Sequence, residues 1–499
     1  MTTCKKLAMV VMAVALSACG GSKDTSNINI SAINNDYKGS WVAQDKGLVI
    51  DITQSAFNIY RFTSDYCLVE DSYENVSNDD INQILNLAND KNSLYWFGGF
   101  GPQDIQAPGF TLLKQNQLPL SCANGIIPSI DDQNYVRNPE LTFDIFSQIF
   151  AEYYLNFDLK SVDWASLVEQ NGVSIDSESS DLDLLVAMDN MISTLSDPHN
   201  SIITPDGIEV SYTNKLSLTE KLAQEYAQAN NLSFPITFES VTQQQIEDIY
   251  AYINTNLTLQ KELIASYADS ETDITTALDG EVFWFENEGL GYLHIGKMYE
   301  YHEDSDDNTP LQNDSLEVSA LDEILDAALS DLNNVEGLII DVRTNVGGHD
   351  FVSLAIASRF TSERIHAYTK YSGRFSNSSE INEVYIEPRG NHKFTGNIVL
   401  LTSETTNSAA EVFTLSMSQL PNVTLIGEAT QGAFSDVMEW QLPNGFEIGL
   451  SSEAYLTPNG DWLEGSGVPV DIEVPFFTLQ ERIEEIDIGI ETAVSVLLN

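Results

Sequence analysis

The first part of the chain alternates apolar and polar residues over short stretches. Residues 48–52 and 57–62 follow this pattern, and Gly39-Ser40-Trp41 precedes them. A period of two places one face of a strand in a core and the other face in water. We therefore predict a small β-rich domain at residues 37–135. It contains no catalytic constellation that we can identify, so we assign it a binding or spacer role.

From about residue 140 the apolar positions follow steps of three and four, the spacing of a helix with one buried face. The first such run contains Phe143, Phe146, Ile149, Phe150 and Tyr153. A second helix is predicted at residues 182–195, and it stops before Pro198, which disfavours helix in the preceding residue. These runs predict a helical domain at residues 136–206. Residues 207–280 are polar and rich in Glu, Gln, Ala and Asn, which predicts a helical insertion.

From residue 281 onward, apolar runs typical of buried strands alternate with helical spacing. Strands are predicted at residues 289–295, 337–342, 398–401 and 423–427, and helices at residues 316–332, 352–360 and 408–420. Alternation of this kind is typical of an α/β fold with helices packed on a sheet. We therefore predict an α/β core at residues 281–499.

The N-terminus has the pattern of a processing signal. Lys5 and Lys6 precede an apolar run at residues 7–15, which is too short to span a bilayer. The following Leu16-Ser17-Ala18-Cys19 resembles the lipobox of bacterial lipoproteins. The resemblance implies a signal peptide at residues 1–18, an acylated Cys19 anchored in a lipid membrane, and a tether at residues 19–36. The alternative is a plain secretory signal with a coincidental cysteine.

Cys19 is followed by glycines rather than by an aspartate. In the lipoproteins that this segment resembles, the absence of that aspartate favours the outer membrane. We therefore expect a cell-envelope protein that faces the periplasm or the exterior. The remaining cysteines fit this compartment: Cys4 leaves with the signal, and Cys67 and Cys122 form an even pair for which a disulfide is expected. No CxxC or HExxH motif occurs, so we predict no metal site.

The charge balance is strongly acidic, with 22 Lys plus Arg against 75 Asp plus Glu and a net charge of −53. Such a surface repels phosphate backbones, which argues against nucleic acid as a partner. It also needs cations for screening, as a salty medium provides. Solvation of the surface explains the acidic residues without a specific site, although a basic substrate stays possible.

Two motifs suggest an acyl-transfer site. Ser408 follows a predicted strand and opens a predicted helix, where free N–H groups favour developing negative charge. The alternative is an N-cap serine paired with Glu411 in a capping box. Gly347 and Gly348 follow another buried strand and could present amides to an oxyanion, or form an ordinary glycine-rich turn.

Two further residues are candidates for proton transfer. His199 follows Pro198 in a turn and is a candidate general base, although a lone loop histidine is often inert. Glu464 precedes Gly465-Ser466-Gly467-Val468 and could orient a histidine, or it could be a solvated loop acid.

The order of these motifs along the chain resembles that of the tail-specific (C-terminal processing) and tricorn-core family of serine peptidases. The order is His199, the Gly347-Gly348 turn, Ser408 and then Glu464. The similarity covers roughly residues 140–205 and 281–480. The segments 158–164, 427–432 and 467–474 also match. The resemblance implies an α/β fold in which a helix-covered sheet of crotonase-like ββα units follows a helical lead-in and the small β-rich domain. The family's PDZ module is not evident in the insertion, so recognition of free C-termini stays open.

The family uses two catalytic designs. One pairs the serine with a lysine about 25 residues later, but Ala433 stands at that position and no lysine follows Lys393. The tricorn-like design uses His, Ser and Glu, for which this chain offers His199, Ser408 and Glu464. Its helper serine precedes the histidine, where Pro198 stands here. Ser201 or Asp197 could replace that helper, or the helper is absent.

The implied reaction is hydrolysis of a peptide or protein through an acyl-enzyme on Ser408. His199 serves as base and Glu464 orients it. The oxyanion hole is formed by the Ala409 amide and an amide of Gly347 or Gly348. No cofactor is required. A non-catalytic binder on the same scaffold and an esterase are the alternative functions.

Overall fold

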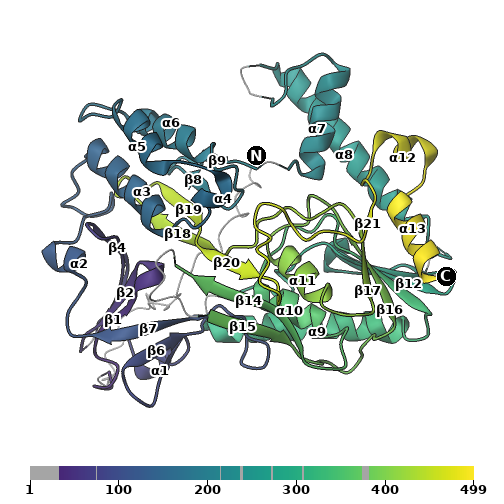
Figure 1. Cartoon of the computed structure of the whole chain (residues 1–499), viewed down its shortest axis with the longest axis horizontal. Helices are drawn as coiled ribbons and strands as arrows, with labels where there is room; N and C mark the ends of the chain where they lie inside the picture. Colours follow the sequence, from purple (N-terminus) through teal and green to yellow (C-terminus); the bar gives the residue numbers. More distant parts are fainter. Residues whose placement is uncertain are drawn as a thin grey trace, which may run out of the picture.

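The computed structural model describes residues 33–54, 56–74, 76–213, 215–236, 240–270, 273–305, 308–373 and 381–498. The predicted signal peptide, Cys19 and most of the predicted tether lie outside these residues. Figure 1 shows a β-rich unit, a helical unit and a larger α/β unit arranged around the centre of the molecule. Within the described residues, no helix is both long and apolar enough to cross a bilayer.

The N-terminal unit is an antiparallel sheet with the strand order β4-β3-β2-β1-β7-β6-β5. Its strands are β1 (Gly39–Ala43), β2 (Leu48–Ile52), β3 (Ala56–Phe62), β4 (Cys67–Glu74), β5 (Leu85–Leu87), β6 (Ser93–Trp96) and β7 (Phe110–Gln115). Short helices η1 (Gln44–Lys46), α1 (Asn78–Ile81) and α2 (Leu120–Asn124) connect or follow them. One face packs around the fully buried Trp41, and a disulfide joins Cys67 to Cys122.

The helical lead-in consists of α3 (Pro139–Tyr153), α4 (Phe157–Lys160), α5 (Trp164–Gly172) and α6 (Asp181–Ile192). Asn138 caps α3, and a capping box at Ser180 begins α6. The predicted second helix extends to residue 195, but α6 ends at Ile192. Leu195 stays buried in the turn that follows. A helical pattern can therefore continue into a turn whose side chains still face the core.

A small sheet connects the lead-in to the C-terminal part of the chain. Its order is β18-β19-β8-β9, formed by β8 (Ser201–Ile203), β9 (Glu209–Ser211), β18 (Val437–Gln441) and β19 (Glu447–Ser451). Ser201 pairs with Gly449 across 248 positions of sequence, the difference between the two residue numbers. The loop that carries His199 is thereby fixed against the end of the α/β unit.

The main sheet has the order β10-β11-β12-β13-β16-β17-β21, and the strands from β12 to β21 are parallel. Its strands are β10 (Thr275–Ala277), β11 (Val282–Asn287), β12 (Leu290–Ile295), β13 (Gly337–Asp341), β16 (Asn397–Thr402), β17 (Val423–Gly427) and β21 (Ile472–Glu473), with η3 (Leu278–Gly280) between the first two. The crossover helices are α9 (Pro310–Asp331), α10 (Asp350–Ala357) and α11 (Ala409–Met417).

Alternate residues of each central strand enter different cores. In β13, Leu338 and Ile340 pack with α9, α10 and α11, whereas Ile339 packs on the opposite face with α13 (Ile488–Leu497). Strands covered on both faces read as continuous apolar runs, which is why the sequence predicts them well. This helix-covered sheet and the one solved structure compared below confirm the predicted fold class.

The remaining elements lie at the borders of the core. A three-stranded sheet contains β14 (Ile365–Ser372), β15 (Ile381–Ile386) and β20 (Glu453–Leu456). The predicted insertion forms α7 (Leu218–Ala229) and α8 (Gln243–Ala265), which pack against each other and lie beside α12 (Leu479–Glu484) and α13 (Figure 1). Parallel strands β13, β16 and β17 all end on one edge of the main sheet, and the candidate site is built there.

Candidate active site

Ser408 occupies the turn between β16 and α11 in an unusual backbone conformation. Its φ is 54° and its ψ is −126°, a combination that side-chain-bearing residues rarely adopt and that is often found where function requires it. The side chain makes no capping hydrogen bond. Glu411 instead accepts hydrogen bonds from Thr430 Oγ1 at 2.6 Å and the Ala433 amide at 2.7 Å. The capping-box alternative is therefore wrong.

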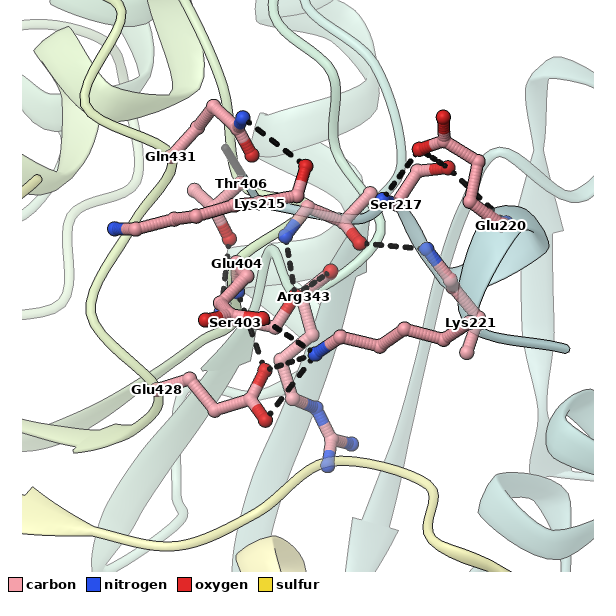
Figure 2. A network of polar contacts seen from close by, with 12 residues as sticks. Lys215, Ser217, Glu220, Lys221, Arg343, Ser403, Glu404, Thr406, Glu428 and Gln431 are labelled. Carbon is pink, nitrogen blue, oxygen red and sulfur yellow. Dashed lines mark hydrogen bonds and ion pairs between the residues drawn. The ribbon is translucent and has the colours of Figure 1, made fainter. Parts of the chain in front are cut away.

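The loop before Ser408 is tied to the end of β13, and these bonds hold the turn. Ser403 Oγ donates to the Arg343 carbonyl at 2.5 Å, and Thr406 Oγ1 donates to the Val342 carbonyl at 2.9 Å. The Asn407 amide donates to the Asn345 carbonyl at 3.1 Å. Figure 2 shows Ser403 and Thr406 against the Arg343 segment.

Arg343, which follows β13, forms a buried ion-pair cluster next to the turn that carries Ser408. Its guanidinium pairs with Asp341 at 2.7 Å and with Asp487 at 2.8 Å, and all three side chains are almost fully buried. The positive charge of Arg343 offsets the burial of Asp341 and lowers the pKa of that carboxyl to about 2. A paired and hydrogen-bonded buried cluster is rigid when its groups are satisfied, so it provides a firm base for the turn.

Gly347 lies directly beside the predicted nucleophile. A β-carbon on Gly347 would lie 2.7 Å from Ser408 Cβ and 2.9 Å from the Ala409 nitrogen, and its φ is 102°. The Gly347 amide donates to Asn345 Oδ1 at 2.8 Å. Within the described part of the chain, the amides of Gly348 and Ala409 have no hydrogen-bond acceptor. Among the described residues, the amides of Gly348 and Ala409 are therefore free to donate, whereas the Gly347 amide is not, and Gly347 permits the close approach.

His199 lies in the turn between α6 and β8, where its amide donates to Asp197 Oδ1 at 3.1 Å. Burial lowers the pKa of the imidazole, while the carboxylates of Asp197 and Asp436 and the carbonyl of Ser435 oppose that shift. Its Nδ1 is buried and has no hydrogen-bond partner among the described residues. Lowering of the pKa favours the neutral imidazole, the form that a general base requires.

Asp197 is held by buried side chains from several elements. Its carboxylate accepts from Tyr154 Oη at 3.0 Å, Asn156 Nδ2 at 3.2 Å and Ser451 Oγ at 3.1 Å. Of the two residues that could replace the missing helper, Asp197 is the one whose charge acts on His199. Ser201 lies in β8, where its Oγ is close to Gly449.

Glu464 is also buried, with 2% of its surface exposed, and its Oε2 accepts from the Phe434 amide at 3.1 Å. Burial raises its pKa well above the usual range, and the neighbouring charge of Asp197 raises it further. These effects favour the protonated carboxyl. The charges that act on His199 come from Asp197 and Asp436, and Asp197 also acts on Glu464.

The structure brings the predicted residues into two groups. Ser408, Ala409 and the two glycines form one. In the other, the charge of Asp197 acts on both His199 and Glu464. In the described chain, no hydrogen bond joins the His199 ring to Ser408 Oγ, although such bonds are often long before substrate binds. Asp436 links the two groups electrostatically, because its charge acts on both His199 and His349, the residue after Gly348.

Asp436 is a functional candidate that the sequence did not reveal, and His349 is a second histidine on which its charge acts. His349 directly follows Gly348, which was an available signal, whereas Asp436 lies in a loop without informative spacing. Asp436 pairs with Lys370, whose Nζ also contacts Glu453 at 2.7 Å. These charges raise the pKa of Lys370, so this buried lysine stays protonated and does not act as a base.

No group of three or more His, Cys, Asp or Glu side chains among the described residues is arranged to hold a metal ion. The chemistry available here is that of a hydroxyl at a helix start, two free amides, and an imidazole flanked by carboxylates. That set fits nucleophilic acyl transfer.

Comparison with known proteins agrees with this chemistry. Residues 289–474 match the model of peptidase family S41. A carboxy-terminal processing protease, CtpA of Bacillus subtilis (strain 168), is 26% identical over 175 residues, which are 35% of this chain and 36% of that protein. The match therefore spans about a third of that relative.

A solved structure from Parabacteroides merdae ATCC 43184, described as a candidate peptidase, has the same fold. It has a TM-score of 0.53 and 24% identity, and the alignment covers 73% of this chain and 98% of that one. Residues 289–474 are thus similar to the core of peptidase family S41, to which the sequence motifs also pointed.

Proposed function

We propose that the protein is a serine peptidase that cleaves peptide bonds through an acyl-enzyme on Ser408. The observation that carries this proposal is the strained Ser408 backbone at the start of α11, with Gly347 against it. A turn of this kind can present a hydroxyl to substrate, and here the first helix amide, that of Ala409, has no acceptor among the described residues. The family of the core and the processing-protease relative support the same activity.

In the proposed mechanism, neutral His199 accepts the Ser408 proton as the hydroxyl attacks the scissile carbonyl. The imidazolium that forms is stabilised by the carboxylates of Asp197 and Asp436. His199 then donates the proton to the leaving amine, and water releases the acyl group by the reverse sequence. Glu464 keeps a supporting role in this proposal and places no charge on the ring, because burial and the charge of Asp197 favour its protonated form.

The tetrahedral intermediate carries its negative charge on the former carbonyl oxygen. In this proposal, the amides of Gly348 and Ala409 donate to that oxygen, supported by their lack of another acceptor among the described residues. The N-terminus of α11 adds a favourable dipole. Loss of one oxyanion donor typically costs about 10²–10³-fold in rate.

The proposed substrate is a peptide or protein, and the proposed location is the bacterial envelope. A lipid anchor at Cys19 would hold the enzyme at the outer membrane, facing the periplasm or the exterior. Support for this location comes from the lipobox-like sequence and from the even Cys67–Cys122 pair. One acylated residue carrying several chains gives stable anchoring.

The test combines covalent labelling with a substrate panel. A fluorophosphonate should label the wild-type chain at Ser408 and fail to label Ser408→Ala, and only the wild type should digest a peptide library. Labelling that persists in Ser408→Ala would overturn the nucleophile. Turnover of esters without peptides would indicate an esterase, and binding without any turnover would indicate a binder on this scaffold.

A further inference from the structure

Residues 215–221, which we call the docking segment, connect the insertion to three loops of the candidate site. The segment precedes and begins α7, and it contacts residues 403–407, residues 428–432 and residues 464–467. These loops lead into Ser408, follow β17 and carry Glu464, respectively. Figure 2 shows the segment lying across the first two loops.

Lys221 joins two of these loops at one atom. Its Nζ is 2.8 Å from Glu404 Oε2 and 3.1 Å from Glu428 Oε2, and both contacts appear as dashed lines in Figure 2. The Glu404 amide also donates to Glu428 Oε2 at 3.3 Å. Two carboxylates this close repel each other unless a cation lies between them. Lys221 therefore keeps the loop before Ser408 next to the loop after β17.

The start of α7 provides a second connection. Ser217 caps the helix and forms a capping box with Glu220, which satisfies the amides of both residues. The Leu218 amide is one of the first-turn donors that a helix leaves unused. It donates to Thr405 Oγ1 at 3.0 Å. The helix end is thus hydrogen-bonded to a residue three positions before Ser408.

Lys215 joins the second loop to the third. Its Nζ donates to the Thr430 carbonyl and, at 3.0 Å, to the Ser466 carbonyl. The Gln431 side chain donates to Thr213 Oγ1 and lies 3.4 Å from the Lys215 carbonyl. Lys215 thereby holds the turn after Glu464 against the backbone at Thr430. The Thr430 side chain is bound in turn by Glu411.

The insertion packs against the α/β unit through a small apolar cluster and partly exposed ion pairs. Leu218 and Leu222 of α7 pack with Leu263 of α8 and with Phe476 and Phe477. The Lys221 side chain is 31% exposed and its two acidic partners are 35% and 21% exposed. Ion pairs at such positions contribute little to global stability. Their loss should change loop positions more than it changes folding.

We propose that Lys215 and Lys221 are positioning residues, through which the seated insertion sets the relative positions of the Ser408 and Glu464 loops. This inference rests on the proposed peptidase function. Peptide hydrolysis then depends on α7 and α8 being docked, and any partner that binds these helices could change the rate without touching the site. A misplacement of about 1 Å far from the chemistry can cost about 10²-fold.

The test measures hydrolysis, labelling and stability for the variants Lys221→Met, Lys215→Met and the double variant. We expect each single variant to lower kcat about 10-fold or more and to slow fluorophosphonate labelling of Ser408 in parallel, with KM nearly unchanged. The melting temperature should stay close to that of the wild type. Lys221→Arg should restore most of the rate, because a guanidinium can bridge two carboxylates.

Lys393→Met is the matched control, since Lys393 is an exposed lysine that donates only to the nearby Gly390 carbonyl within the described structure. Thr405→Val tests the same connection without changing charge, and it should slow labelling as well. Variants that label and hydrolyse at the wild-type rate would overturn the inference, and so would a rate loss fully explained by unfolding in both Lys221→Met and Thr405→Val. Absence of labelling in the wild type would instead overturn the peptidase function.

Discussion

Gly347 is packed so closely against Ser408 that a β-carbon at position 347 would lie 2.7 Å from Ser408 Cβ. Real β-carbons do not approach this closely. Position 347 therefore requires a glycine, because there the turn after β13 packs against the start of α11. The contact joins the two motifs to which we assign the proposed chemistry, and it separates the roles of the two glycines. Gly347 permits the approach, while Gly348 leaves its amide free.

The first prediction concerns Gly347→Ala. The new methyl group should displace Ser408 and reduce labelling and hydrolysis by about 10²-fold or more, because alignment of the nucleophile is lost. Gly460→Ala is the matched control: its φ of 89° resembles the 102° of Gly347, but no atom lies within 4 Å of the added carbon. Both variants should lose about 1 kcal/mol of stability from the left-handed backbone. Equal activities in the two variants would contradict the contact.

The second prediction distinguishes the two histidines near Asp436. His199→Gln should lower kcat/KM by about 10²–10⁴-fold, the range expected for loss of a general base. His349→Gln should retain most of the activity, because His349 stacks on Phe351 at a centroid distance of 5.0 Å as the cap residue of α10. Circular dichroism would show that both variants fold. The opposite ranking would assign the base to His349.

The third prediction is the pH dependence of kcat/KM. His199 must be neutral to accept a proton, and burial lowers its pKa below the ordinary value of 6.5. Activity should therefore persist below pH 6.5 and fall only as the pH drops through the lowered pKa. Asp436→Asn removes a charge that favours the imidazolium, so the acid limb should move to lower pH while kcat decreases.

The exposed ion pair between Arg364 and Glu387 offers the control, as Glu387→Gln makes the same change of charge away from the site. Its profile should match the wild type. The groups that face His199 are Asp197, Asp436 and the Ser435 carbonyl. An Asp436→Asn profile identical to the wild type would leave Asp197 as the carboxylate that stabilises the imidazolium.

The sequence predicted the parts of the molecule that local chemistry determines. Buried parallel strands such as β13 and β16 are continuous apolar runs, and the glycines and Ser408 stand at fixed positions after them. β14 was missed because Lys370, a charged residue, lies within it. That charge is tolerated only through pairing with Asp436 and Glu453, and no local pattern reveals those partners.

The carboxylates around His199 could not be assigned from sequence for the same physical reason. Asp197 and Asp436 both act on His199 only because β8 pairs with β19 and β19 pairs with β18. Ser451 of β19 binds both Asp197 and Asn200, and the next residue, Ser452, donates its amide to Ser435 Oγ at 2.9 Å. A long-range strand pairing therefore decides which acids face the base, whereas the motif order suggested Glu464 alone.

The last prediction concerns the buried charge cluster beside the site. The Lys370 side chain is 3% exposed and lies between Asp436 and Glu453, and Glu453 also pairs with Lys46 of the N-terminal unit. Lys370→Met removes the shared cation and leaves two acids near each other, so we expect a loss of about 3–5 kcal/mol in unfolding free energy. Denaturant titration would measure it. Lys297→Met, at a pair whose acidic partner is 64% exposed, should change stability by less than about 1 kcal/mol. A loss that small in Lys370→Met would mean that the cluster does not stabilise the junction between the N-terminal sheet and the core.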